Sequence, residues 1–451
     1  MSGASIEQTL DFWSAELRAV KAQIQPLFGH ASVAASAAAF LDGLLGPERR
    51  KTGWMRAEAA GDPGPWRQQA VLGRSRWDAD ALRDLVRDYA LEALAAPDAV
   101  LVLDETGFLK QGTSSCGVQR QYTGSAGKIT NCQIGVFAAY VADRGHAFID
   151  RRLYLPRSWT DQPDRLRAAH VPEDVRFATM IGSAGHPLPQ GSAPCRRRRR
   201  AGHRRRDDRA RARSGCRLCP SAACGGRFCE DGSAKGRWVA ADSIYGVGEV
   251  EKVLRRAGKG YVLGVTGTHP FCSWGKAPVA GTADEIAQSL PASAWARLSA
   301  GDGPKGPRLY DWAYLELADL DAEEVGCPEP GTWTRGLLVR RSLADQSLAY
   351  FTTWCPGATS LEVLVGVEGR RWAIEDAFET AKTELGLEHH ETRSWHGWHR
   401  HVSLVMLAFA LLVVIRHRAN TTPPPPKSAP SEPRRRWSAG RSRRSAVSPA
   451  G

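Results

Sequence analysis

Three acidic residues stand at positions where carboxylates could bind a metal, and two of them end apolar runs. Asp104 follows the run at residues 99–103, and Asp242 follows the run at residues 238–241. Short continuous apolar runs are typical of buried strands. A charged residue there is solvated, paired or bound to a metal, because burying it bare is costly. A single aspartate in this place is usually a cap or turn former, but two of them favour a binding site at the ends of the strands.

The third acidic residue, Glu375, lies in a helix that we expect over residues 361–385. Steps of four and seven residues place four charged side chains on one face of this helix: Arg371, Glu375, Glu379 and Lys382. Taken alone, such a stripe indicates a solvated row of ion pairs. Ile374 and Phe378 make the opposite face apolar, so we predict that the helix packs on the core and aims the stripe at a fixed place.

These residue types fit the cleavage of phosphodiester bonds with the help of two divalent cations. The reaction needs hard oxygen ligands around ions roughly 3.5–4 Å apart. Mg²⁺ commonly takes a few carboxylates and keeps water and phosphate oxygens as its other ligands. Asp104, Asp242 and Glu375 would hold two Mg²⁺ or Mn²⁺ ions, and Arg371 and Lys382 would bind phosphate beside them.

Three blocks around these acids resemble those of bacterial insertion-sequence transposases of the DDE type. The first block reads DETGFLKQG from residue 104 and GVQRQY from residue 117, and the second reads WVAADSIYG from residue 238. The third begins with RRWAIE at residue 370 and has the spacing Arg, three residues, Glu, six residues, Lys. The resemblance covers most of residues 5–415 and is specific, because three ordered blocks agree.

The resemblance implies an α/β fold: an RNase H-like mixed sheet flanked by helices, with an N-terminal helical domain and a β-rich insertion. It implies a DNA transposase that cuts transposon ends and joins them to target DNA, with Asp104, Asp242 and Glu375 as catalytic metal ligands. The partners would be the terminal inverted repeats, the target DNA and a second copy of the chain in a synaptic dimer. The residues expected to contact DNA are Arg371, Lys382, Arg120, Arg400, Arg67 and Arg74. Arg120 follows a strand in a Gly-rich turn, so it either contacts the DNA backbone or only closes a hairpin.

Two positions depart from the family pattern. The tyrosine expected before Arg371 falls on Glu368, and the acidic residue expected after Asp242 is Ser243. Neither change removes a metal ligand. The first would weaken a DNA contact, and the second would alter hydrogen bonding beside Asp242.

The predicted domain organisation follows the change from helical to strand patterns. The expected parts are a helical, DNA-binding domain at 1–95, the first part of the catalytic core at 96–268, a β-rich insertion at 269–358, core helices carrying the glutamate at 359–418, and a disordered basic tail at 419–451. Further strands are expected at 133–141, 147–155, 261–265, 308–317, 332–340 and 347–353, and further helices at 66–76, 79–94 behind an Asp78 N-cap, and 398–415. Residues 269–310 are rich in Gly, Pro and Ala and are expected to be loop.

The net charge of +13 is concentrated in two segments. Residues 196–213 hold eleven Arg and two Asp, and residues 427–444 hold seven basic residues and one Glu. The remainder is close to neutral, so bulk charge is weak evidence for DNA binding. The start of the chain lacks a signal-peptide pattern, and the apolar run at 402–415 is shorter than the about 20 residues that a bilayer requires. We therefore expect a cytoplasmic protein of the bacterial nucleoid, without a membrane partner and with reduced cysteines.

Residues 181–236 differ in composition from the rest of the chain and hold five of the ten cysteines: Cys195, Cys216, Cys219, Cys224 and Cys229. A zinc site is one interpretation, although the second cysteine pair is widely spaced. A basic loop that contacts DNA is another. We favour a frameshifted stretch, because Arg, Pro, Gly, Ala and Cys crowd together without periodicity and the family pattern resumes at Arg237.

Two other functions stay open at this point. An RNase H-like, structure-specific nuclease would cut DNA but would not join paired ends. A non-catalytic, DNA-binding relic of a transposase would bind DNA, and changing Asp104 would then remove no activity.

Overall fold

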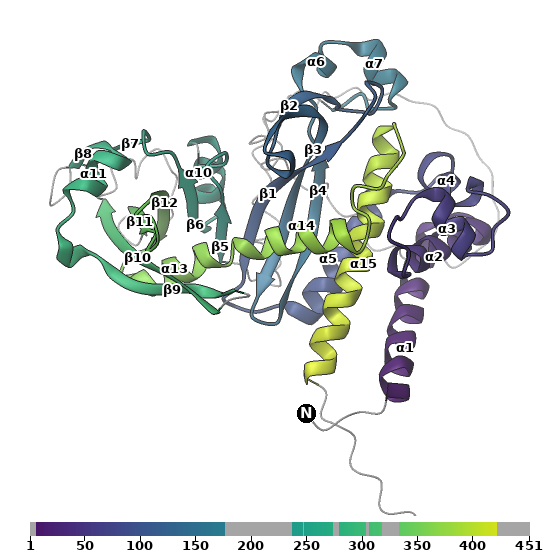
Figure 1. The fold of residues 1–451 in the computed structure, drawn as a ribbon, viewed down its shortest axis with the longest axis horizontal. Helices are drawn as coiled ribbons and strands as arrows, with labels where there is room; N and C mark the ends of the chain where they lie inside the picture. Colours follow the sequence, from purple (N-terminus) through teal and green to yellow (C-terminus); the bar gives the residue numbers. More distant parts are fainter. Residues whose placement is uncertain are drawn as a thin grey trace, which may run out of the picture.

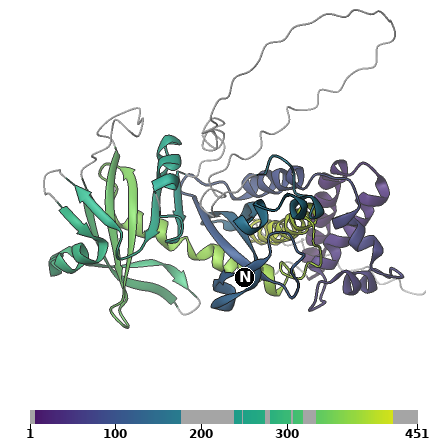
Figure 2. The same ribbon diagram turned by 90° about the horizontal axis from the view of Figure 1, so that it is seen from above.

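The computed structural model describes residues 6–175, 237–246, 248–273, 279–303, 306–317 and 333–421. The molecule is elongated, with the N-terminal helices at one end, a β-rich part at the other end and a mixed α/β part between them (Figure 1, Figure 2). The predictions made for residues 181–236 and for the tail after Thr421 lie outside the described residues.

One mixed sheet runs through the central and β-rich parts. In the described residues it has ten strands, in the order β2-β3-β1-β5-β6-β12-β11-β10-β9, with β4 also paired to β3. The strands are β1 (Val100–Leu109), β2 (Gln119–Thr123), β3 (Lys128–Ala142), β4 (Gly145–Leu153), β5 (Trp238–Ala241), β6 (Gly260–Val265), β9 (Ala296–Gly303), β10 (Gly306–Leu317), β11 (Trp333–Arg341) and β12 (Leu348–Pro356).

The central five strands confirm the predicted RNase H-like sheet. β4, β3 and β1 are antiparallel neighbours, whereas β1, β5 and β6 are parallel. Strand β5 is buried at every position, as its continuous apolar run predicts. Helices cover both faces: α10 (Gly248–Arg256) packs Val250 against one face, and α5 (Ala79–Leu94), α14 (Trp372–Thr383) and α15 (Trp395–Thr421) cover the other.

The β-rich insertion is confirmed, but it is continuous with the core. Strand β12 pairs with β6 from Tyr350↔Val265 to Trp354↔Tyr261, so the insertion extends the central sheet. The predicted loop at 269–310 is wrong. That stretch contains β7 (Pro270–Ser273), β8 (Val279–Thr282), α11 (Ala283–Ser289) and β9. Glycine and proline suggested loop, whereas pairing with neighbouring strands and a Thr282–Glu285 capping box fix regular structure there.

Five helices precede the sheet, as the pattern predicts. They are α1 (Ile6–Ile24), α2 (Ala31–Leu45), α3 (Gly53–Ala59), α4 (Trp66–Gly73) and α5. The Asp78 side chain accepts a hydrogen bond from the Asp80 backbone N–H and caps α5 as expected. Helix α5 packs against α15 and β4, so this part of the chain shares a core with the sheet.

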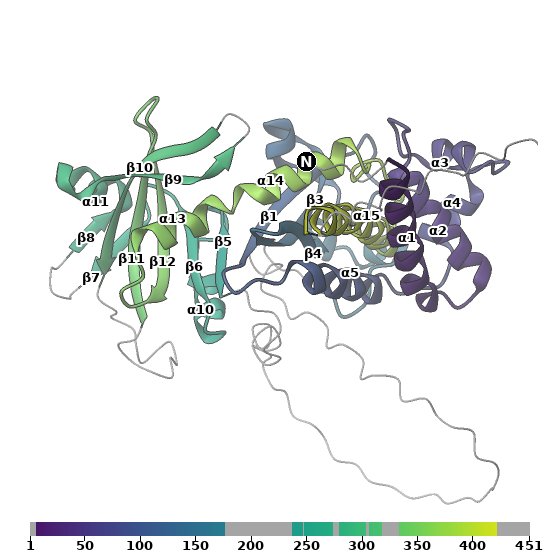
Figure 3. The same cartoon turned by 90° about the horizontal axis from the view of Figure 1, so that it is seen from below.

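The single helix predicted over residues 361–385 is two helices. α13 (Leu361–Gly369) ends at Arg370, and α14 begins after Arg371. Gly369 has close contact with β9, where a Cβ atom would lie 2.1 Å from the carbonyl oxygen of Ala300. The two helices run nearly in line from the insertion across the central strands, and they join the two parts of the sheet (Figure 3).

Helix α15 is the most buried helix of the core. Among the described residues it is the helix that is long and apolar enough, by length and composition, to cross a membrane. Two-thirds of its apolar stretch (67%) is buried inside the protein, as expected for a core helix. Trp398 is fully buried and contacts Phe108 and Phe137 of the sheet.

Arg151 connects three elements on the face of the sheet that α5, α14 and α15 cover. This β4 guanidinium donates hydrogen bonds to the Asp80 carboxylate of α5 at 2.7 Å, to the Ala79 carbonyl at 3.0 Å and to the Ser403 hydroxyl of α15 at 3.0 Å. Its side chain is 1% exposed. A buried charge of this kind is stable only while its partners remain in place.

We predict that Arg151→Met lowers the free energy of unfolding by about 3 kcal/mol, because three hydrogen bonds of a buried guanidinium are lost at roughly 1 kcal/mol each. The urea midpoint, followed by circular dichroism, measures this loss. Arg152→Met is the matched control on the same strand, and it should cost less than about 1 kcal/mol because the Arg152 side chain is only half-buried. Equal midpoints for the two variants would contradict the role assigned to Arg151.

Candidate active site

Parallel pairing of β1 and β5 brings the two predicted aspartates together. Leu103 is the register partner of Ala241, so Asp104 and Asp242 are the next residues on adjacent strands. The prediction that β1 ends at Asp104 is wrong, because the strand continues through five more residues to Leu109 and stays paired with β3. The apolar run stops at Asp104, but backbone pairing with β3 does not depend on apolar side chains and continues to Leu109.

Asp104 projects toward α14, the helix that carries Glu375. Its register partner is Phe137, and directly opposed residues of antiparallel strands project from the same face. Phe137 packs against Phe378 of α14, with ring centroids 5.2 Å apart. The predicted apolar face of this helix is therefore confirmed.

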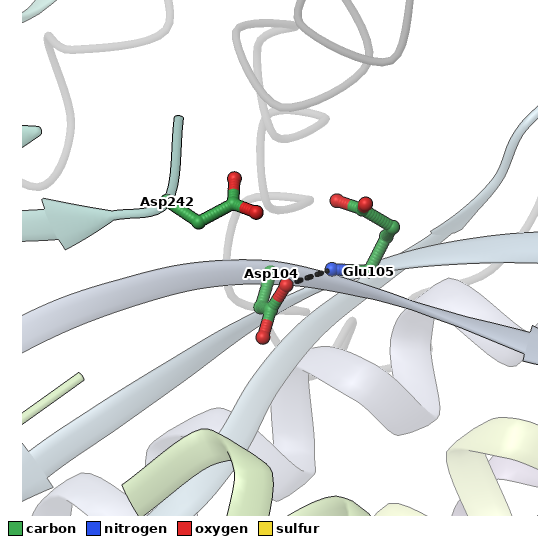
Figure 4. A group of neighbouring side chains, drawn as sticks. All are labelled: Asp104, Glu105 and Asp242. Atoms are coloured by element: carbon green, nitrogen blue, oxygen red, sulfur yellow. Dashed lines mark hydrogen bonds between the residues drawn. The ribbon is translucent and has the colours of Figure 1, made fainter. Parts of the chain in front are cut away.

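Glu105 projects from the opposite face of β1, as Figure 4 shows. Its carboxylate accepts a 2.7 Å hydrogen bond from the hydroxyl of Tyr245, which is buried on the α10 side of the sheet. Asp242 extends from the end of β5 toward β1 (Figure 4). One ligand oxygen each of Asp104, Glu105 and Asp242 lies within 4.8 Å of the others.

Glu105 was not predicted as a member of the site, although it stands in the first block. Adjacent residues of a strand point to opposite faces, so its neighbour Asp104 gave no reason to expect it there. The available signal was a pair of consecutive carboxylates inside a buried strand. Together the three carboxylates form a close acidic cluster near the end of β5.

The electrostatics of this cluster fit a divalent cation. Burial, followed by repulsion from Glu105 and Asp242, raises the pKa of Asp104 to about 8. Burial also raises the pKa of Asp242 and of Glu105. Crowded carboxylates with raised pKa values are the hard, anionic oxygen donors that Mg²⁺ and Mn²⁺ prefer, so the residues present fit such an ion.

Asp242 is held by its own turn and by a close neighbour. Its carboxylate accepts a 3.0 Å hydrogen bond from the backbone N–H of Ile244, as in an Asx turn. Gly264 on β6 lies beneath this turn, and a Cβ atom there would be 2.8 Å from the backbone nitrogen of Ser243. Ser243, where the family pattern has an acid, is exposed and leaves the turn intact.

Helix α14 lies along β1 with Arg371 toward the aspartates. The Arg371 guanidinium lowers the pKa of both Asp104 and Asp242, so it lies within electrostatic range of each. It donates a 2.8 Å hydrogen bond to Glu375. Glu375 is outside the group of three close carboxylates found among the described residues. Its connection to the aspartates therefore runs through Arg371.

Lys382 lies at the other end of the same stripe. Its ammonium donates a 2.7 Å hydrogen bond to the Ser125 hydroxyl, which is 3.2 Å from the Thr106 hydroxyl. Thr106 is two residues from Asp104 and on the same face of β1. Arg371, Glu375 and Lys382 therefore face the surface of β1 that carries Asp104.

The other residues predicted to contact DNA divide into exposed and buried ones. Arg120 on β2, Arg67 on α4 and Arg74 after α4 are exposed, and Arg67 forms an ion pair with Asp62. Arg400 is 8% exposed and donates hydrogen bonds to the carbonyls of Leu72 and Trp77. These contacts hold α15 to the N-terminal helices, so Arg400 as placed here is occupied inside the protein.

Glu368, where the family pattern has tyrosine, is a buried acid at the end of α13. It forms a 2.9 Å ion pair with Arg340 of β11, and its side chain is 1% exposed. The positive field of Arg340, Arg371 and Arg308 lowers its pKa, while burial raises it more. Glu368 therefore joins strand β11 of the insertion to the end of α13, just before Arg371 and α14.

The comparisons with known proteins agree with this geometry. The family described as DDE superfamily endonuclease matches residues 23–285, more than half of the chain and including Asp104 and Asp242. The chain belongs to this DDE superfamily. A probable transposase for insertion sequence element IS701 from Microchaete diplosiphon is 34% identical over 97 residues, 21% of this DDE-superfamily chain. The match spans only a quarter (25%) of that relative's length.

A solved structure, the piggyBac transposase synaptic complex with hairpin DNA, is also similar to this DDE-superfamily protein. It aligns with 91% of this chain and 73% of that chain, at 10% identity and a TM-score of 0.39. The fold assignment rests on the strand order of the sheet and not on this likeness.

We predict that Asp104→Asn stabilises the metal-free protein at neutral pH. The folded state raises the pKa of Asp104 from about 4 to about 8, so wild-type stability should fall as pH rises through this window. The variant should lack this dependence of stability on pH. In EDTA its free energy of unfolding should exceed that of the wild type by at least ~1 kcal/mol, and its melting temperature should be higher. It should also lose the rise in melting temperature that Mn²⁺ gives the wild type.

Asp302→Asn, on the exposed part of β9, is the matched control for this prediction. It should keep both the pH slope and the Mn²⁺ effect. A lower melting temperature of Asp104→Asn in EDTA, with the Mn²⁺ effect retained, would contradict the proposed metal site.

Proposed function

We propose that this protein is a DNA transposase that cleaves strands at transposon ends and transfers them to target DNA. The observation that carries the proposal is the pairing of β1 with β5, which places Asp104 beside Asp242 and beneath α14 in a chain of the DDE superfamily. A mobile-element function is also supported by the name of the relative from Microchaete diplosiphon.

Asp104, Asp242 and Glu375 are the proposed ligands of two Mg²⁺ or Mn²⁺ ions, with Glu105 adding negative charge from the other face of β1. Bound ions of this kind activate a water or a 3′-hydroxyl and stabilise the leaving oxygen. The chain's own part is to orient the ligands. The rigid parallel strands hold the two aspartates, and the Tyr245 hydroxyl holds Glu105. Helix α14 carries Glu375 on the charged stripe that faces β1.

Arg371 and Lys382 are the proposed phosphate contacts beside the reacting bond. Both lie on the α14 stripe, and their cationic groups form charge-assisted hydrogen bonds with phosphate oxygens. Arg120, Arg67 and Arg74 are exposed on β2 and near α4, where they are proposed to bind the DNA backbone farther from the cut. Two ends and two copies of the chain would meet in a synaptic dimer.

The deciding experiment is metal-dependent cleavage and joining of duplexes that carry the element's own terminal repeats. In Mg²⁺ or Mn²⁺, the wild type should nick each end and join the new 3′-hydroxyl to target DNA. Asp104→Ala, Asp242→Ala and Glu375→Ala should each lower the cleavage rate by ~10³-fold or more, because each removes several kcal/mol of transition-state stabilisation. All three should still bind DNA, since the phosphate contacts remain.

Three results would count against the proposal. Cleavage without joining would indicate a structure-specific nuclease. Binding without cleavage, unaffected by changes at Asp104, would indicate a non-catalytic relic. Full activity of Glu375→Ala, with the two aspartate variants inactive, would show that α14 does not supply the third ligand.

We predict that Arg67→Ala and Arg74→Ala weaken DNA binding without changing the cleavage rate of bound DNA. Each should reduce the slope of log affinity against log salt concentration by about 1, because one phosphate contact is lost. Fluorescence anisotropy across a salt series measures the slope. Arg297→Ala, on β9 of the insertion and paired with Asp311, is a control that should leave it unchanged.

A further inference from the structure

Arg371 is surrounded by carboxylates in the proposed active site. Glu368, Glu375 and Asp104 raise the pKa of its guanidinium, and Arg371 in turn lowers the pKa of Asp242. Its side chain is 15% exposed. A fixed positive charge therefore lies in the same field of carboxylates that is proposed to attract divalent cations.

The guanidinium is held in place from the side of the insertion. It stacks on the Trp372 ring at 5.1 Å, and Arg308 of β10 lies over the same ring at 5.6 Å. Arg308 also donates a 2.9 Å hydrogen bond to the carbonyl of Gly369, at the end of α13. The buried Glu368–Arg340 pair fixes the preceding turn to β11.

Glu375 is the freer partner of the Arg371–Glu375 ion pair. Its side chain is 41% exposed, against 15% for Arg371, and its Oε1 accepts the guanidinium at 2.8 Å. An oxygen that accepts from a guanidinium cannot offer the same lone pair to a cation. In this arrangement Glu375 is absent from the group of close carboxylates formed by Asp104, Glu105 and Asp242.

We propose that Arg371 is a positioning residue that holds Glu375 away from the metal site until DNA binds. A phosphate of the bound DNA then accepts the hydrogen bonds of the Arg371 guanidinium. Glu375 is thereby free to bind the metal together with Asp104 and Asp242. This inference rests on the proposed function and deepens it, because it makes the metal site complete only when substrate is present.

The exchange is chemically balanced. Arg371 gives up a charge-assisted hydrogen bond to a carboxylate and gains one to a phosphate, whose oxygens match the guanidinium fork. Glu375 has room to turn once the ion pair opens, because its side chain is partly exposed. By linkage, DNA and divalent cations must then increase each other's affinity by the same factor.

The experiment measures Mn²⁺ binding to the full chain without DNA, by electron paramagnetic resonance of the free ion. Arg371→Ala should bind Mn²⁺ about 5- to 10-fold more tightly than the wild type, because Glu375 becomes free and a positive charge is removed. Arg370→Ala is the matched control. Arg370 is the preceding residue, but it pairs with Asp98 and Asp143 at the surface, so its loss should leave Mn²⁺ affinity unchanged.

A double variant separates release of Glu375 from the simple loss of positive charge. Arg371→Ala combined with Glu375→Gln should lose most of the gain in Mn²⁺ affinity. In the otherwise wild-type chain, Glu375→Gln should leave the DNA-free Mn²⁺ affinity within about 2-fold, because Glu375 is not yet a ligand, whereas Asp242→Asn should weaken it strongly. This last comparison needs no Arg371 variant, so it can still overturn the inference if Arg371→Ala fails to fold.

Unchanged or weaker Mn²⁺ binding by folded Arg371→Ala would overturn the inference. So would a gain that persists in full in the double variant, or strong weakening by Glu375→Gln alone. These results leave the proposed function intact. A wild-type chain that binds no Mn²⁺ at all, with or without DNA, would overturn the proposed function and this inference together.

Discussion

The structure depends on one strand pairing, the parallel alignment of β1 with β5. It joins residues separated by more than a hundred positions and sets Asp104 beside Asp242 without help from either side chain. The backbone hydrogen bonds and the buried apolar residues on both strands stabilise this arrangement, and the repulsion between the carboxylates opposes it. Burial of the Asp104 carboxyl and, in second place, repulsion from Glu105 and Asp242 raise its pKa.

The second constraint is the helix that faces the aspartates. α14 has a buried apolar side, which fixes its rotation about its own axis, and a charged side, which is thereby aimed at β1. Its N-terminal end is tied to the insertion through the Glu368–Arg340 pair and the stack of Arg308, Trp372 and Arg371. Because β12 continues the core sheet from β6, the insertion and the strands that carry the two aspartates form one sheet. A distortion of the insertion would therefore be transmitted through these contacts to the residues around the proposed metal site.

The site combines three crowded carboxylates with one partly buried cation, the guanidinium of Arg371. Three carboxylates crowd near the end of β5, and one guanidinium lies within electrostatic range of two of them. The same guanidinium occupies Glu375, which leaves the predicted third ligand engaged elsewhere in the resting protein. Protein side chains alone thus reach only a partial balance of charge. Divalent cations would offset the charge of the carboxylates, and DNA phosphate would offset the charge of Arg371. Binding of both would complete the balance of charge.

The sequence by itself determined the elements and the residue types. Continuous apolar runs located β5 and the first half of β1, helical spacing indicated the stripe of α14, and Asp78 marked the start of α5, because each depends on neighbours along the chain. Long-range contacts decided the rest. They paired β12 with β6, built strands where Gly and Pro suggested loop, buried Arg400, and added Glu105 to the acidic cluster. Local sequence carries no information on which distant backbone will supply a partner, so these features became visible only once the sheet had been assembled.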